Sequence, residues 1–146
     1  MAADSFLRSD LVSVQEIPGR VNVLVTGGAG FIGSHIAERL TTSDERVLVV
    51  DDLSAGVNHV PPGAEFERRD VAGRGMQSVV RRWRPDVVVH CAGQVSVAMS
   101  VRDPLRDAHS NVLGTIAVLQ AAEAAGCRAF VYLSIGGAIY GDPVYL

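Results

Sequence analysis

The sequence contains no lysine, and all thirteen of its basic residues are arginine. This absence excludes a P-loop lysine, a Schiff-base lysine and a catalytic Tyr–Lys pair supplied by this chain alone. The acidic residues outnumber the basic ones and give a net charge of -3, which offers no general electrostatic reason to bind nucleic acid or an anionic membrane surface. We therefore expect neither nucleic acid nor a membrane among the partners.

Long apolar runs are also missing from the sequence. No stretch approaches the length needed to span a bilayer. Residues 1–20 lack the apolar core of a secretory signal, because Asp4, Arg8, Asp10 and Glu16 interrupt them. They show no sustained periodicity and are expected to form an N-terminal tail. We expect a cytoplasmic protein.

Metal-ligand patterns are absent as well. The chain has two cysteines and four histidines, and their spacing matches no usual set of metal ligands. We expect no metal site, and we expect Cys91 and Cys127 to be reduced thiols in or beside buried strands. The histidines are His35, His59, His90 and His109.

What the sequence does contain is a glycine-rich turn between a predicted strand and a predicted helix. Residues 21–25 are nearly all apolar and β-branched, as in a strand buried on both faces. Glycines then recur through residues 27–33, and Ile32, Ile36 and Leu40 follow at helical spacing. Such a turn aims backbone N–H groups and the positive end of a helix dipole at one point, which suits a pyrophosphate. Alternatively, the glycines only let the helix pack close to the strand.

An acidic residue follows the second apolar run. Residues 47–50 predict another buried strand, and Asp51 ends it, 18 residues beyond Gly33. A carboxylate at this position can accept both hydroxyls of an adenosine ribose and would repel a 2′-phosphate. The pattern therefore predicts NAD rather than NADP as the cofactor.

The order of the remaining elements predicts the fold. A strand, a helix and a strand are followed by a third strand, and then by helix, strand, helix and strand. This order is typical of an α/β, Rossmann-type, doubly wound parallel sheet, with five strands in spatial order 3-2-1-4-5. We assign residues 21–146 to one NAD-binding domain that lacks the last strands and the substrate domain of such proteins. The later elements are expected as strands at 64–69, 86–91 and 129–133 and helices at 74–84 and 104–125.

Six motifs in consistent order resemble the extended short-chain dehydrogenase/reductase family, the NAD-dependent nucleotide-sugar epimerases and dehydratases. The ending GGAIYG is more similar to the UDP-glucose 4-epimerase branch than to the dehydratase branch. The motifs are TGGAGFIGSH at 26–35, VVDDLS at 49–54, DV at 70–71, HCAGQVSVAMSVRDP at 90–104, NVLGT at 111–115 and GGAIYGDP at 136–143.

The resemblance implies how these motifs would hold NAD. The pyrophosphate would lie on the glycine turn, the adenine ribose on the acidic motif, and the nicotinamide beyond the fourth strand. Asn111 is similar to the family's asparagine near the cofactor, although a local hydrogen bond to the backbone is an alternative role for it. The implied binding residues are Gly27, Gly30, Phe31, Ile32 and Gly33 for the pyrophosphate; Asp51, Asp52 and Leu53 for the ribose; Asp70 and Val71 for the adenine; and Ala92, Gly93, Gln94 and Asn111 towards the nicotinamide.

The resemblance also implies a nucleotide-sugar 4-epimerase activity, with residues that this chain does not supply. The family places a Tyr-x-x-x-Lys pair about twenty-five residues past the IYG motif, beyond Leu146. The family's hydroxyl-bearing residue after the fifth strand falls on Ile135, so Ser134 is the candidate to replace it, and Tyr140 matches the structural IYG tyrosine. A nucleotide-sugar substrate is therefore expected only if the missing part is supplied. The alternatives are an inactive NAD-binding module, a fragment, or a nucleotide-sugar 4,6-dehydratase.

The fifth strand would form an exposed edge of the predicted sheet. Its unpaired backbone groups would be a template for pairing with another chain. We expect either a homodimer through this edge or the amino-terminal part of something longer.

Overall fold

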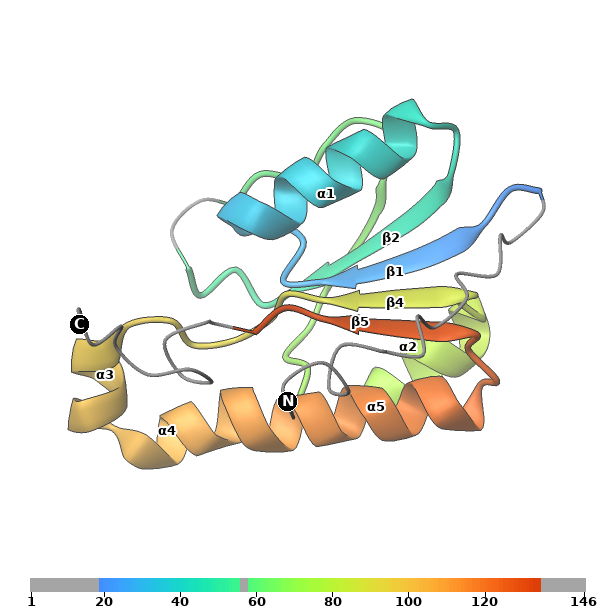
Figure 1. The fold of residues 1–146 in the computed structure, drawn as a ribbon. Coiled ribbons are helices and arrows are strands. Elements are labelled where there is room, and N and C mark those ends of the chain that lie inside the picture. Colours follow the sequence, from blue (N-terminus) through green and yellow to red (C-terminus); the bar gives the residue numbers. More distant parts are fainter. Residues whose placement is uncertain (1–18, 56–57, 135–146) are drawn as a thin grey trace, which may run out of the picture.

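The computed structural model describes residues 19–55 and 58–134 and arranges them as one parallel β-sheet with helices on both faces (Figure 1). The strand order is β3-β2-β1-β4-β5 and every neighbouring pair is parallel. The predicted sheet order is therefore confirmed. The strands are β1 (Asn22–Thr26), β2 (Arg46–Asp51), β3 (Glu65–Arg68), β4 (Val87–His90) and β5 (Ala129–Tyr132).

The helices connect these strands. The predicted helix at 104–125 runs through three consecutive elements, and the middle one is a turn of π-helix. The short helix that precedes them, α3, was not among the predicted elements. The helices are α1 (Phe31–Thr42), α2 (Met76–Trp83), α3 (Val97–Arg102), α4 (Pro104–Ala108), the π-turn η1 (His109–Leu113) and α5 (Gly114–Ala124).

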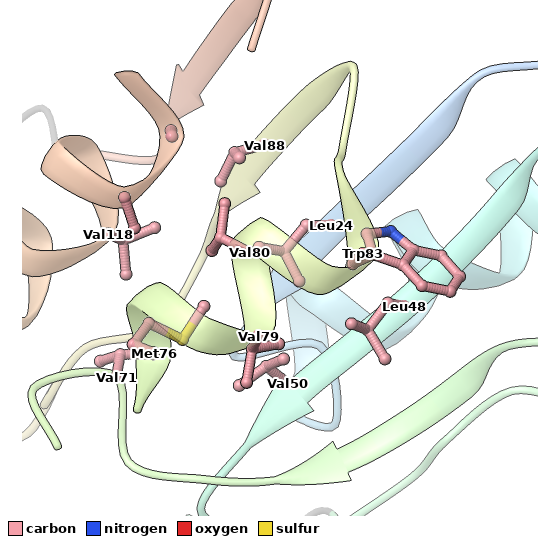
Figure 2. Close-up of a cluster of buried hydrophobic side chains, with 12 residues drawn as sticks. Leu24, Leu48, Val50, Val71, Met76, Val79, Val80, Trp83, Val88 and Val118 are labelled. Carbon is pink, nitrogen blue, oxygen red and sulfur yellow. The ribbon is translucent and has the colours of Figure 1, made fainter. Parts of the chain in front are cut away.

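Two apolar layers hold the helices on the sheet. Successive residues of a strand point to opposite faces, so Leu24 of β1 packs with α2 and α5, whereas Val25 packs on the α1 side. Figure 2 shows the first layer, in which Val80 and Val118 lie against the sheet beside Val88. Leu24, Val25, Val80, Val88 and Val118 are all fully buried. Each such side chain contributes roughly 1.5–3 kcal/mol by leaving water.

The two cysteines are free thiols at the margins of these layers. Cys91 packs against the α1-side layer, and Cys127 packs against the other. Burial raises the pKa of the Cys91 thiol to about 11 and also raises that of Cys127. The Cys127 Sγ donates to the carbonyl oxygen of Pro85 at 3.1 Å. Both groups are therefore protonated thiols at neutral pH.

The parallel register brings the carboxyl ends of the central strands to one edge of the sheet. Thr26 of β1 pairs with Val50 of β2 on one side and with His90 of β4 on the other. In open α/β sheets, ligands bind outside this edge, where the winding direction reverses. Within residues 19–55 and 58–134, no helix is long and apolar enough to cross a membrane.

Candidate nucleotide-binding site

The turn between β1 and α1 passes very close to the loop after β4. Gly27 has a φ of +66°, and a Cβ on it would lie 2.5 Å from the backbone nitrogen of Ala92. Its N–H donates to the carbonyl oxygen of Val50 at 2.8 Å. A Cβ on Gly33 would overlap the carbonyl oxygen of Gly27. The packing role that the sequence left open is therefore present at Gly33, and backbone atoms of the turn lie close to the loop after β4.

Helix α1 begins at this turn without a side-chain cap. Its N-cap residue, Gly30, has no side chain, and the first turn contains no acidic residue. The N–H groups of Phe31, Ile32 and Gly33 have no acceptor within the helix, and the helix dipole adds partial positive charge there. The Phe31 and Ile32 side chains are exposed. This end of α1 can accept a phosphate or diphosphate group.

The Asp51 carboxylate lies beside the glycine turn, as the sequence predicted for a residue at the end of β2. Its Oδ2 accepts from the N–H of Ala29 at 3.0 Å, and its Oδ1 accepts from the N–H of Leu53 at 2.8 Å. Each carboxylate oxygen has a second lone pair. The side chain is thus fixed by two backbone bonds and can still accept hydroxyl groups.

The two residues after Asp51 differ in their surroundings. Asp52 is exposed, and its side chain accepts from the N–H of Ser54 at 2.8 Å, which closes a local turn. Leu53 has a φ of +62° and packs against the α1-side apolar layer. Leu53 therefore shapes the loop through its backbone, whereas Asp52 faces solvent.

Asp70 and Val71 follow β3; Asp70 contacts the π-turn, and Val71 contacts the start of α5. Asp70 accepts from the N–H of Ala72 at 2.9 Å, and its Oδ2 lies 3.2 Å from the Nε2 of His109. Val71 is buried in the apolar layer, where Gly114 at the start of α5 lies against it. Val71 therefore belongs to the apolar layer, and the Asp70 side chain is partly exposed to solvent beside it.

The loop after β4 is held by Asn111 of the π-turn. The Asn111 Oδ1 accepts from the N–H of Gln94 at 2.7 Å, and its Nδ2 donates to the carbonyl oxygen of Gln94 at 2.9 Å. A Cβ on Gly93 would lie 3.0 Å from the same Oδ1. Asn111 therefore does bond to the backbone, but its partner Gln94 lies 17 residues away along the chain, so this is not the local hydrogen bond that the sequence left open.

His90 is a polar residue of the site that the sequence analysis considered only as a metal ligand. It ends β4, is fully buried, and bonds through both ring nitrogens to Thr26 and Thr115. Burial lowers its pKa from 6.5 to about 4, so the ring is neutral at neutral pH. The sequence feature that could have identified His90 is its place as a single polar residue directly after the apolar run 87–89. In the part of the chain that the structure covers, no cluster of histidine, cysteine, aspartate or glutamate side chains could hold a metal ion.

Ser134 lies two residues beyond β5 and is exposed. Ile135, Tyr140 and the IYG motif lie outside the described residues. The candidate cofactor residues lie at or just beyond the carboxyl ends of four neighbouring strands. They are Gly27 to Gly33, Asp51 to Leu53, Asp70, Val71 and Ala92 to Gln94. The carboxyl end of the sheet therefore combines a candidate anion site with carboxylates that can accept hydrogen bonds from hydroxyl or amino groups.

A sequence model described as the NAD-dependent epimerase/dehydratase family matches residues 23–145. The chain is 40% identical over 129 residues to a UDP-glucose 4-epimerase of Mycolicibacterium smegmatis. It is 39% identical over 123 residues to a UDP-glucose 4-epimerase of Rhizobium meliloti. These matches cover 84% of this chain in both cases, but 41% and 37% of the relatives. The chain therefore spans about two fifths of the length of the curated relatives that it matches.

Solved structures show the same similarity. The UDP-glucose 4-epimerase of Thermotoga maritima, solved with UDP-glucose, is 42% identical and superimposes with a TM-score of 0.81 over 86% of this chain and 41% of that one. The Thermus thermophilus UDP-glucose 4-epimerase, solved as a complex with NAD, is 44% identical with a TM-score of 0.79 over 85% and 40% of the two chains.

Proposed function

The chain belongs to the NAD-dependent epimerase/dehydratase family, and we propose that it is the NAD-binding part of a nucleotide-sugar 4-epimerase of the UDP-glucose type. One observation carries the proposal. The Asp51 Oδ2 lies 3.0 Å from the N–H nitrogen of Ala29, so a fixed carboxylate adjoins the uncapped start of α1. A carboxylate that could accept ribose hydroxyls thus lies next to backbone N–H groups that could bind phosphate, which supports a site for an adenosine diphosphate.

We assign the binding roles from this geometry and from the family. The glycine turn and the N–H groups of Phe31, Ile32 and Gly33 would hold the pyrophosphate. Asp51 would accept the adenine ribose hydroxyls, with Asp52 and Leu53 beside it, and its negative charge would disfavour the 2′-phosphate of NADP. Asp70 and Val71 would flank the adenine, and Ala92, Gly93, Gln94 and Asn111 would line the path to the nicotinamide. Bound NAD would supply a hydride acceptor.

Proton removal from the sugar needs residues that this sequence does not contain. In the family, a tyrosine whose pKa is lowered by a neighbouring lysine takes the hydroxyl proton, and the chain has no lysine. Ser134 is the candidate in these residues for a contact to the reacting hydroxyl. We propose that the chain alone binds NAD and turns over little or no nucleotide sugar, and that turnover requires a polypeptide with the Tyr-x-x-x-Lys pair.

The test is a calorimetric titration of NAD into the purified chain and into Asp51→Asn. The variant keeps the shape of the side chain but loses its charge, so we expect its Kd to rise about tenfold to a hundredfold, as for loss of a charged hydrogen bond. Asp44→Asn is the matched control, because Asp44 lies in the α1–β2 connection, at the other end of β2. Thermal unfolding of both variants checks that the fold is kept. Equal NAD affinity in all three proteins would remove the ribose assignment.

The second candidate function is an NAD-binding module that catalyses nothing. The two candidates differ when a polypeptide that carries the Tyr-x-x-x-Lys helix is added. Recovery of 4-epimerase activity supports the enzyme, whereas NAD binding without activity supports the module. A 4,6-dehydratase would release water from the sugar instead, which product analysis distinguishes. We place the protein in the cytoplasm in each case.

We also propose that the free edge of β5 pairs with a second copy of the chain. Among the residues that the structure covers, β5 pairs with β4 alone. Val131 and Tyr132 in this strand are 48% and 53% exposed. An uncovered strand with apolar side chains is a template for another strand.

A further inference from the structure

We propose that His90 is a positioning residue, which holds the loop after β4 in its cofactor-binding geometry through Thr115 and Asn111 and carries its ring proton on Nε2. This inference deepens the proposed function, because the loop that it positions is the one we assign to the nicotinamide side of NAD.

The contacts of the ring connect the end of β1 with the start of α5. The Nδ1 of His90 lies 2.6 Å from the Thr26 hydroxyl, in the residue just before the glycine turn. Its Nε2 lies 3.0 Å from the Thr115 hydroxyl, in the first turn of α5. The rings of Phe130 and Tyr132 lie with their centroids 5.8 Å from the imidazole. Both polar atoms of a fully buried ring are therefore partnered.

The direction of each bond follows from the donors available. The Thr115 hydroxyl lies 2.7 Å from the carbonyl oxygen of Asn111, and a carbonyl oxygen can only accept. A hydroxyl has one proton, so Thr115 donates it to Asn111 and must accept from His90. The proton of the neutral imidazole is therefore on Nε2, and Nδ1 accepts from the Thr26 hydroxyl.

This chain of bonds ends at the loop after β4. Thr115 fixes the carbonyl of Asn111 in the π-turn, and π-turns are frequent at functional sites. The side chain of the same Asn111 forms the paired bonds to the backbone of Gln94. His90 therefore acts on the loop through two intermediates and need not touch the cofactor itself.

A histidine that merely fills the core would need volume and polarity but no particular proton. Two variants separate the possibilities. Gln at position 90 places an amide donor near the position of Nε2 and can keep the bond to Thr115. Asn is shorter and places its polar atoms near the position of Nδ1, so it keeps only the bond to Thr26. We expect His90→Gln to bind NAD within about twofold of the unchanged chain, and His90→Asn to bind about tenfold more weakly, the effect of one lost hydrogen bond.

A spectroscopic measurement on the unchanged protein keeps the test independent of how the variants fold. The imidazole nitrogen chemical shifts of ¹⁵N-labelled protein distinguish a protonated from an unprotonated ring nitrogen. We expect protonated Nε2 and unprotonated Nδ1 at neutral pH without NAD. The opposite tautomer, a charged ring, or equal NAD affinity of folded His90→Gln and His90→Asn would overturn the proposal. If the unchanged chain fails to bind NAD, the proposed function fails, and the nitrogen shifts still decide whether His90 donates to Thr115.

Discussion

At the scale of single residues, the site depends on side chains whose polar atoms are fixed by the backbone. Asp51 was predicted from its position at the end of a buried apolar run, and the structure places its carboxylate on the N–H groups of Ala29 and Leu53. The role of His90 could not be predicted in the same way. Its partners Thr26 and Thr115 lie 64 and 25 residues away, and only the folded sheet brings the three together.

The buried His90 predicts how stability changes with pH. Its pKa is lowered from 6.5 to about 4 in the folded protein, so between these values the unfolded chain takes up a proton that the folded chain does not. The stabilising effect is complete above pH 6.5 and is lost as the pH falls towards 4. We expect a loss of at most about 3 kcal/mol from this group, measured by urea unfolding across that range.

The control for this measurement is His90→Gln, which removes the titrating group and keeps a polar side chain. The contributions of all other residues are common to the two proteins and cancel in the comparison. A variant whose stability falls as steeply as that of the unchanged chain between pH 6.5 and about 4 would contradict a buried neutral His90.

At the scale of elements, the strands and the helix at 104–125 were predictable, whereas the short helix α3 and the π-turn were not. The valine-rich runs of β1, β2 and β4 stand out because both faces of these strands are buried. Helix α3 has no buried residue, and its Val97 and Val101 are 78% and 79% exposed, so it lacks the apolar stripe that reveals a helix. The π-turn could not be predicted from the sequence either. Its residue Asn111 contacts Gln94, which is distant along the chain, and the folded structure is needed to reveal that contact.

The glycine turn gives a prediction at the same scale. Alanine at position 27 would have to adopt the φ of +66° and would also press its Cβ against the backbone of Ala92. Gly126, just after α5, has a similar φ of +74° but no atom within 4 Å of an added Cβ. We expect both substitutions to cost about 1–2 kcal/mol for the left-handed backbone, and Gly27→Ala to cost at least about 1 kcal/mol more for the overlap.

Urea unfolding of the two alanine variants measures this difference. Gly126→Ala is the matched control, since it shares the backbone strain and lacks the close approach. Equal losses of unfolding free energy would mean that the glycine turn can move away from the loop after β4 at little cost. That result would contradict a tight contact between Gly27 and Ala92.

At the scale of the whole molecule, the predicted topology indicates where the candidate site lies. The order of strands and helices along the sequence predicted a 3-2-1-4-5 sheet, and that order alone places residues 27–33, 51–53, 70–71 and 92–94 along one edge. The family's Tyr-x-x-x-Lys pair is not in this sequence, so the described residues support a proposal about cofactor binding and not one about turnover.

Within the described residues β5 pairs with β4 alone, which leads to a prediction about assembly. We expect the chain to form a dimer whose fraction rises with concentration, because two such edges can pair through their backbone groups. Light scattering over a range of concentrations measures this. Val131→Lys places a charge on the edge strand, which disfavours edge pairing, and should shift the equilibrium towards monomer. A monomer at every concentration would contradict the proposed edge contact.

The central claim is that the edge formed by the glycine turn and Asp51 binds NAD, and backbone amide NMR during a titration with NAD tests it most directly. We predict that the largest shift changes fall on residues 27–33, with further changes at 51–53, 70–71 and 92–94, and that NADP produces them only at much higher concentration. Saturable shift changes confined to other parts of the chain, or no change at the glycine turn when NAD is in large excess, would contradict the account.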